Sequence, residues 1–168
     1  IDGIERADEL GVDVMSLSLG GLPTTNNPYI PVIDSATANG TLVVISAGNN
    51  GPISFSIGTP GDVESALTVA ATDNTDTIAG FSSRGPTDFS EQLKPNIAVP
   101  GFGIISANGY GEDTPENLYT SKSGTSMSAP MVSGAAALII EDKPELPVQH
   151  VRSSLVTTTD RIPEYDAY

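Results

Sequence analysis

Apolar and polar residues along the first part of the chain recur with a helical period and then with a strand period. Ile4, Ala7 and Leu10 recur at helical spacing before Gly11, which predicts that an amphipathic helix ends there. The segment Val12–Leu19 then alternates apolar with polar or small residues, as a strand does. A helix followed by a strand is therefore predicted for this region.

A second helix and a second strand follow along the chain. A helical stretch over Ile30–Ala38 is ended by Asn39 and Gly40, and Leu42–Ile45 is a β-branched run typical of a strand that is buried on both faces. Strand, helix and strand in this order form a βαβ unit, in which the two strands are parallel and the crossover is right-handed.

The remaining pattern adds shorter elements. Ala66–Ala71 is predicted to be another strand, Ile78–Phe81 a shorter strand, and residues 108–120 an acidic, polar surface loop. Apolar residues recur at helical spacing between Val148 and Leu155, which predicts a closing amphipathic helix. Together these elements predict a single α/β layered domain without a separate linker.

The most informative stretch is Ser123–Ile140. Small residues open it, and an unbroken apolar segment follows, with Pro130 placed where the first turn of a helix tolerates a proline. Because a helix without a polar face must be covered on all sides, this one is predicted to lie in the middle of the domain. Ser126 would then lie at the positive end of the helix dipole, where developing negative charge is stabilised.

Composition excludes several functions. The 168 residues, 38% hydrophobic and 17% charged, are enough for one globular domain. The net charge of -14 argues against nucleic acid and anionic membrane surfaces as partners, because both would repel the chain. The absence of cysteine excludes thiol chemistry, and no apolar run approaches the length that spans a membrane.

The segment Gly124–Pro130 reads Gly-Thr-Ser-Met-Ser-Ala-Pro and resembles the nucleophile signature of the subtilisin-like serine peptidases, the subtilases. In that family the serine after Gly-Thr attacks the peptide carbonyl, so the resemblance implies that Ser126 is the nucleophile. Met131 stands where many members have a histidine, at a position that is not catalytic. Taken alone, the segment is also compatible with a small-residue turn that leads into a core helix.

A second sequence match indicates an oxyanion hole. Asn49, in the segment Ser46–Gly51, follows the carboxyl end of a predicted buried strand, where α/β sheets usually place their sites. This segment resembles the subtilase motif in which the asparagine side chain works with the backbone N–H of the nucleophilic serine. An ordinary Asn-Gly turn is the alternative interpretation.

A third match concerns substrate binding. The segment Ser18–Gly21 resembles the subtilase backbone that pairs with an extended polypeptide substrate by strand addition. A strand end with an ordinary turn is the alternative here. The resemblance implies a substrate groove and a specificity pocket of moderate width, with Phe81 on the leaving-group side. The implied binding residues are Ser18, Leu19, Gly20, Ala47, Gly48, Gly58 and Phe81.

Weaker matches follow in the same order along the chain. Ile57–Gly61 resembles a family turn whose proline is often cis, Phe81–Pro86 a family Phe-Ser-Ser segment, and Val99–Gly101 a family Ala-Pro-Gly turn. Residues 149–155 resemble the helix that follows the nucleophile helix. The resemblance thus extends over nearly the whole chain and implies the parallel-sheet, three-layer α/β fold of subtilisins.

Two members of the catalytic triad are missing from the resemblance. In subtilases the aspartate and the histidine precede the serine, whereas the only histidine here, His150, follows Ser126 and is expected at the surface. We therefore expect residues 1–168 to be the C-terminal part of a subtilisin-like peptidase domain, nearly inert alone. Because missing strands leave an apolar sheet edge, we expect it to pair with the N-terminal half of the same domain or with another copy.

No cofactor is expected for catalysis. Asn96 stands where many relatives have an aspartate that helps a weak cation site, so this segment does not support a structural calcium ion. The resemblance implies an extracellular protein whose signal region is not in this sequence.

Two other interpretations remain open. The first is a non-catalytic module, a pseudoenzyme or scaffold, that keeps the peptide groove. The second is another class of serine hydrolase, because Gly124, Ser126 and Ser128 nearly form a nucleophile elbow. That motif fails at its last residue, which is not glycine, and no predicted strand directly precedes Ser126.

Overall fold

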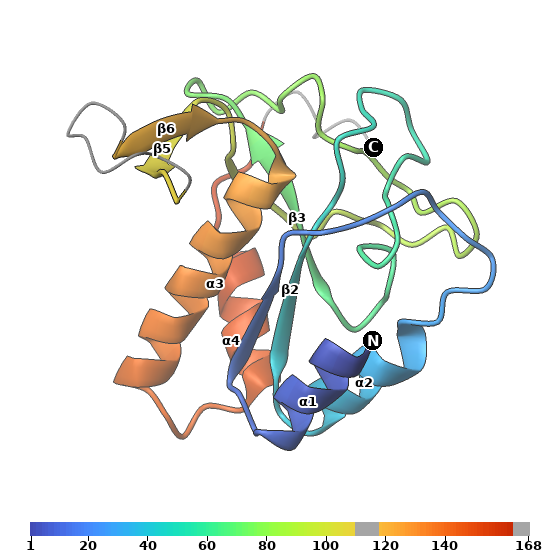
Figure 1. Ribbon diagram of the computed structural model, residues 1–168, viewed down its shortest axis with the longest axis vertical. Coiled ribbons are helices and arrows are strands. Elements are labelled where there is room, and N and C mark those ends of the chain that lie inside the picture. Colours follow the sequence, from blue (N-terminus) through green and yellow to red (C-terminus); the bar gives the residue numbers. More distant parts are fainter. Residues whose placement is uncertain (110–117, 163–168) are drawn as a thin grey trace.

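The structure of the chain, a computed structural model, describes residues 1–109 and 118–162 (Figure 1). Parallel strands form a central sheet in the order β1-β2-β3-β4, and a separate antiparallel pair is formed by β5 and β6. The strands are β1 (Val14–Leu17), β2 (Leu42–Ser46), β3 (Leu67–Thr72), β4 (Ile97–Pro100), β5 (Ile104–Ala107) and β6 (Tyr119–Lys122). The helices are α1 (Asp2–Glu9), α2 (Ile30–Ala38), α3 (Thr125–Asp142) and α4 (Val148–Thr157).

Strand β2 divides the core into two halves because its side chains point alternately to the two faces of the sheet. Leu42 and Val44 pack in one cluster with residues of α3 and α4, and Val43 and Ile45 pack in another with residues of α1 and α2. The sheet therefore lies between two helical layers (Figure 1). This arrangement confirms the predicted three-layer α/β fold.

One predicted strand is wrong. Ile78–Phe81 forms only an isolated bridge, between Ile78 and Thr72, and not a strand. The N–H of Ala79 donates to Ala71 at 2.9 Å, and the N–H of Ser82 then donates back to Ala79 at 2.9 Å. The second bond closes a turn that leads the chain away from β3, so the pairing cannot continue.

The predicted surface loop over residues 108–120 is wrong at its C-terminal end. Tyr119 and Thr120 belong to β6, because Tyr119 pairs with Ala107 and Thr120 with Ser106 across the hairpin. Residues 110–117 lie outside the described residues.

Helix α3 differs from the prediction in two ways. Its buried residues lie along one face, whereas Met131 and Leu138 on the other face are 41% and 67% exposed, so the helix is not covered on all sides by the described residues. A helix that is apolar on all sides is expected to be buried, but this pattern does not indicate which of its faces the rest of the chain covers. Pro130 is the sixth residue of α3 and not part of its first turn.

The edge of the sheet at β1 is open, since β2 is its one neighbour in the described sheet. Strand β1 is shorter than predicted because its pairing with β2 extends only from Val14 to Leu17. In the described ranges, no helix combines the length and apolarity that crossing a bilayer requires.

Candidate active site

Three chain segments converge at the carboxyl ends of β1 and β2. The segment after β1, the segment after β2 and the first turn of α3 line a groove of about 410 Å³. Among the residues that line it are Ser18, Leu19, Gly20, Gly48, Asn49, Thr125 and Ser126. The groove thus brings together Ser126, Asn49 and four of the residues predicted to bind substrate.

The Asn49 side chain is oriented by Thr125. Its Oδ1 accepts hydrogen bonds from the Thr125 backbone N–H at 3.0 Å and from the Thr125 hydroxyl at 3.1 Å. The Thr125 hydroxyl in turn accepts the N–H of Gly48 at 3.2 Å. Because Oδ1 is occupied by these donors, Nδ2 is the end of the Asn49 amide left to donate to a ligand.

Ser126 is half-buried at the second position of α3. Its hydroxyl donates to the carbonyl oxygen of Ser18 at 3.4 Å, and the Ser18 hydroxyl donates to the carbonyl oxygen of Ser126 at 2.8 Å. The N–H of Ser126 belongs to the first turn of the helix, whose N–H groups have no acceptor within the helix. The backbone N–H of Ser126 and the side chain of Asn49 are therefore potential donors at the groove that both residues line.

The turn at Gly101 fixes the start of α3. A β-carbon at Gly101 would lie 2.3 Å from Ser128 Oγ and 2.6 Å from Ala71 Cβ, so only glycine fits there. The Gly101 carbonyl accepts the N–H of Gly124 at 2.8 Å, and the Ser128 hydroxyl donates to Pro100 at 3.2 Å. These contacts hold the N-terminus of α3 against the end of β4.

Three predicted site residues lie outside the groove lining. Ala47 and Gly58 are buried behind it, where the N–H of Gly58 donates to Ala47 at 3.0 Å. A β-carbon at Gly58 would lie 2.4 Å from the carbonyl oxygen of Gly21, so this pair supports the wall of the groove. Phe81 is half-buried, and its carbonyl oxygen accepts the N–H of Gly51 at 2.9 Å.

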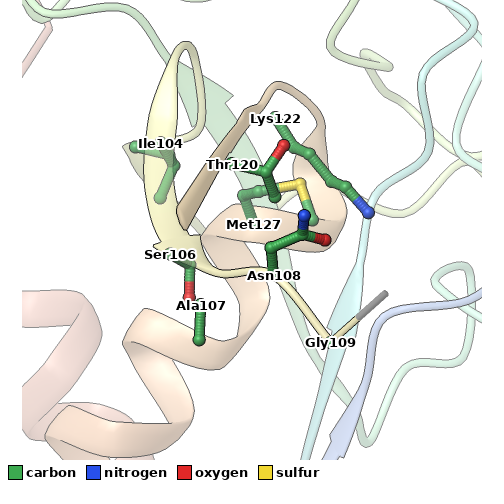
Figure 2. A pocket seen from close by; sticks show the side chains of 8 residues that line it. All are labelled: Ile104, Ser106, Ala107, Asn108, Gly109, Thr120, Lys122 and Met127. Carbon is green, nitrogen blue, oxygen red and sulfur yellow. The ribbon is translucent and has the colours of Figure 1, made fainter. Parts of the chain in front are cut away.

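A second hollow, of about 280 Å³, lies between the β5–β6 hairpin and α3. Figure 2 shows the side chains of Met127, Thr120 and Asn108 gathered there, with Lys122 extending past them. Met127 directly follows Ser126, so the hollow and the groove meet at the first turn of α3. Lys122 is the one charged residue among the described residues that line the hollow.

Comparison with known proteins shows which family the chain belongs to. The family model described as "Subtilase family" matches residues 1–167. The chain belongs to the subtilase family of serine peptidases.

Individual relatives are similar over most of this subtilase chain. It is 37% identical to serine protease AprX of Bacillus subtilis, covering 92% of the chain and 39% of the relative. It is 37% identical to subtilisin DY of Bacillus licheniformis, covering 96% of the chain and 55% of the relative. A solved structure of a Pseudoalteromonas arctica protease superposes with a TM-score of 0.80 at 32% identity, covering 96% of the chain and 51% of that structure.

The subtilase chain therefore spans about half the length of that solved structure and of subtilisin DY, and less of AprX. Its fold is accordingly an incomplete portion of the subtilisin-like fold. The peptide bond between Thr59 and Pro60 is cis, as the resemblance implied.

Thr125 is a residue of the groove whose contact with Asn49 was not predicted from the sequence. The interpretation of Gly-Thr-Ser used the serine and treated the threonine only as part of the motif. The signal was a hydroxyl directly before the nucleophile, but its partner Asn49 lies 76 positions away in the sequence. The contact depends on how α3 packs against β2, so no local sequence pattern predicts it.

Among the described residues that line the groove there is no histidine and no charged side chain. His150 is exposed on α4 and does not line the groove. Within residues 1–109 and 118–162, no group of three or more histidine, aspartate or glutamate side chains is placed to hold a metal ion. The Asn96 Oδ1 accepts a hydrogen bond from the buried Lys94 Nζ at 2.9 Å.

Lys94 is surrounded by oxygen atoms. Its Nζ donates to the carbonyl of Ala66 at 2.6 Å and to the Thr68 hydroxyl at 3.0 Å. Burial lowers the pKa of Lys94 from its ordinary 10.5 to about 7, and the charge of Arg152 acts in the same direction. The carboxylates at Glu64 and Asp62 act against this shift. Lys94 therefore has a structural role, and it is not among the described residues that line the groove.

Proposed function

We propose that this subtilase chain carries the nucleophile and the oxyanion hole of a serine endopeptidase that hydrolyses peptide bonds. The placement of Ser126 and Asn49 at one groove is the observation that supports it most. Asn49 Nδ2 and the N–H of Ser126 would donate to the oxyanion of the tetrahedral intermediate. Preorganised donors of this kind stabilise the charge that develops in the transition state.

The reaction would proceed through an acyl-enzyme. Ser126 Oγ attacks the carbonyl carbon of the substrate while its proton passes to a base. Collapse of the tetrahedral intermediate breaks the C–N bond, and the amine leaves with that proton. Water then hydrolyses the ester on Ser126, which restores the hydroxyl and releases the acid.

The base is not among the described residues that line the groove. The Ser126 hydroxyl donates to a carbonyl oxygen instead, which cannot accept its proton during attack. We infer that a histidine and an aspartate come from a part of the protein outside this chain. This chain by itself would then be nearly inert, since loss of the histidine alone costs subtilisin about 2 × 10⁶-fold in kcat.

The partner that supplies these residues is proposed to be the N-terminal half of the same catalytic domain. The exposed apolar face of α3 and the open edge of β1 are the surfaces that such a half would cover. A second copy of this chain is the alternative occupant, and the one histidine that it would bring is His150, which is exposed on α4.

A polypeptide is the proposed substrate. Its acyl side would pair with the extended backbone at Ser18–Gly20 by strand addition. Its leaving side would pass Met127 and the hollow beside Lys122, because that hollow adjoins the same turn of α3. An extracellular location and the absence of a catalytic cofactor remain part of this proposal.

A non-catalytic peptide-binding module is the second candidate, because the described groove lacks a base. A fluorophosphonate probe separates the two, since it reacts only with an activated serine. We expect the probe to label Ser126 in the full-length protein, and neither the Ser126→Ala variant nor this chain alone. A full-length protein that binds peptides but resists the probe would be the binding module.

A further inference from the structure

We propose that Ser18 is a positioning residue for the nucleophile, because its hydroxyl takes the place of a helical N–H that Pro130 removes. The inference deepens the proposed function and depends on Ser126 being the nucleophile. It assigns a role to the Ser18 side chain, whereas the proposed substrate pairing uses only the Ser18 backbone.

The carbonyl of Ser126 lacks its usual helical donor. In an α-helix the carbonyl of each residue accepts the N–H of the residue four positions later. For Ser126 that residue is Pro130, which has no N–H. The usual backbone donor to the nucleophile's own carbonyl is therefore absent.

The Ser18 side chain supplies the missing donor. The Ser18 hydroxyl donates to the Ser126 carbonyl oxygen at 2.8 Å, from a residue 108 positions earlier in the chain. The Ser126 hydroxyl lies 3.4 Å from the Ser18 carbonyl oxygen. Ser18 thus contacts both the peptide unit and the reactive oxygen of Ser126.

Ser18 is itself held in a fixed position by the central sheet. Ser18 directly follows β1, whose backbone is fixed by pairing with β2 as far as Leu17. Its hydroxyl therefore ties the nucleophile to the central sheet, at the segment proposed to pair with substrate. Because the bond is solvent-exposed, water can replace it and its loss should affect folding little. Its loss should instead loosen the placement of Ser126, on which the rate depends.

The test is a double-mutant cycle on peptide hydrolysis by the full-length protein. Ser18→Ala is expected to lower kcat by about fivefold to tenfold with KM changed less than about twofold. Pro130→Ala restores an N–H four residues after Ser126. In that background, Ser18→Ala is therefore expected to lower kcat by less than about twofold. Ser16→Ala, the same substitution at an exposed position of β1, is the matched control and should leave kcat unchanged.

Equal losses of kcat from Ser18→Ala in the wild-type and the Pro130→Ala backgrounds would overturn the inference, as would a change confined to KM. Ser126→Ala separates this failure from failure of the proposed function. If Ser126→Ala abolishes hydrolysis while the cycle shows equal losses, only the role of Ser18 is wrong. If Ser126→Ala leaves hydrolysis intact, both the proposed function and the role of Ser18 are overturned.

Discussion

Asn49 and Thr125 form a two-point contact across the groove, in which one amide oxygen accepts both the backbone N–H at 3.0 Å and the hydroxyl at 3.1 Å of the same threonine. The contact joins the end of β2 to the first residue of α3. It fixes the direction of the Asn49 amide, so its nitrogen is oriented before any substrate arrives.

The threonine hydroxyl is expected to contribute to the rate through this contact. Thr125→Val removes the hydroxyl and keeps the N–H, so Asn49 loses one of its two donors and its amide is less firmly held. We expect kcat for peptide hydrolysis to fall about threefold to tenfold, the value of one hydrogen bond. Thr125→Ser, which retains the hydroxyl, should stay within about twofold. Equal rates for the valine and serine variants would exclude an orienting role for the hydroxyl.

Lys122 is expected to influence which residue is accepted on the leaving side of the cleaved bond. The ion pairs found among the described residues do not include it, and it is the one charge at the hollow beside Met127. An exposed ion pair contributes about 0.2–1 kcal/mol, so peptides with glutamate there should be preferred over glutamine about twofold to fivefold in kcat/KM. Lys122→Glu should reverse the preference, and about 1 M salt should erase it. An unchanged preference in the variant would refute the assignment.

The exposed face of α3 should prove to be covered in the full-length protein. Leu138 is 67% exposed here, but a proposed N-terminal half would bury it. Leu138→Glu is then expected to destabilise the full-length protein by about 2–4 kcal/mol, as a buried charge does. Leu93→Glu, at a loop residue that is 89% exposed, is the control and should have little effect. If the Leu138→Glu and Leu93→Glu variants unfold at similar temperatures, the exposed face of α3 lies in solvent in the full-length protein as well.

Lys94 should make the stability of the protein depend on pH between about 7 and 10.5. Its pKa is about 7 when folded and ordinarily 10.5, so between these pH values the unfolded chain binds more protons at this site. The contribution of Lys94 to the free energy of unfolding is therefore fully present above pH 10.5 and is lost as the pH falls through about 7.

Urea unfolding of the wild type and of Lys94→Met across this range measures the effect. The free energy of unfolding should rise with pH more steeply in the wild type than in Lys94→Met. Lys143→Met, which removes an exposed lysine beside Asp142, should retain the wild-type slope. Parallel curves for the wild type and Lys94→Met would show that Lys94 keeps its ordinary pKa.

The elements that the sequence predicted well are those whose pattern is local. The β-branched run Leu42–Ile45 predicted β2 with its two buried faces, and the helical stretch Ile30–Ala38 coincides with α2. Motifs at a strand end and a helix start predicted that Ser126 and Asn49 belong to one site, and both residues line the groove. That placement suffices because the carboxyl ends of parallel strands meet at one edge of the sheet.

The features that the sequence did not reveal depend on contacts between distant segments. Tyr119 looked like a loop residue, yet it pairs with Ala107 across the hairpin. The hydrogen bond from Ser18 to Ser126 depends on the separation of β1 and α3, which no local pattern encodes. The exposed face of α3 was missed because its residues are small or apolar on every side.

The oxyanion hole is tested most directly by the turnover number of an Asn49→Leu variant of the full-length protein. Leucine has nearly the shape of asparagine but lacks the amide donor. We predict that kcat for peptide hydrolysis falls about 10²- to 10³-fold, with KM changed by no more than a few fold. A variant that turns over as fast as the wild type would contradict the assignment of Asn49 and Ser126 to one catalytic site.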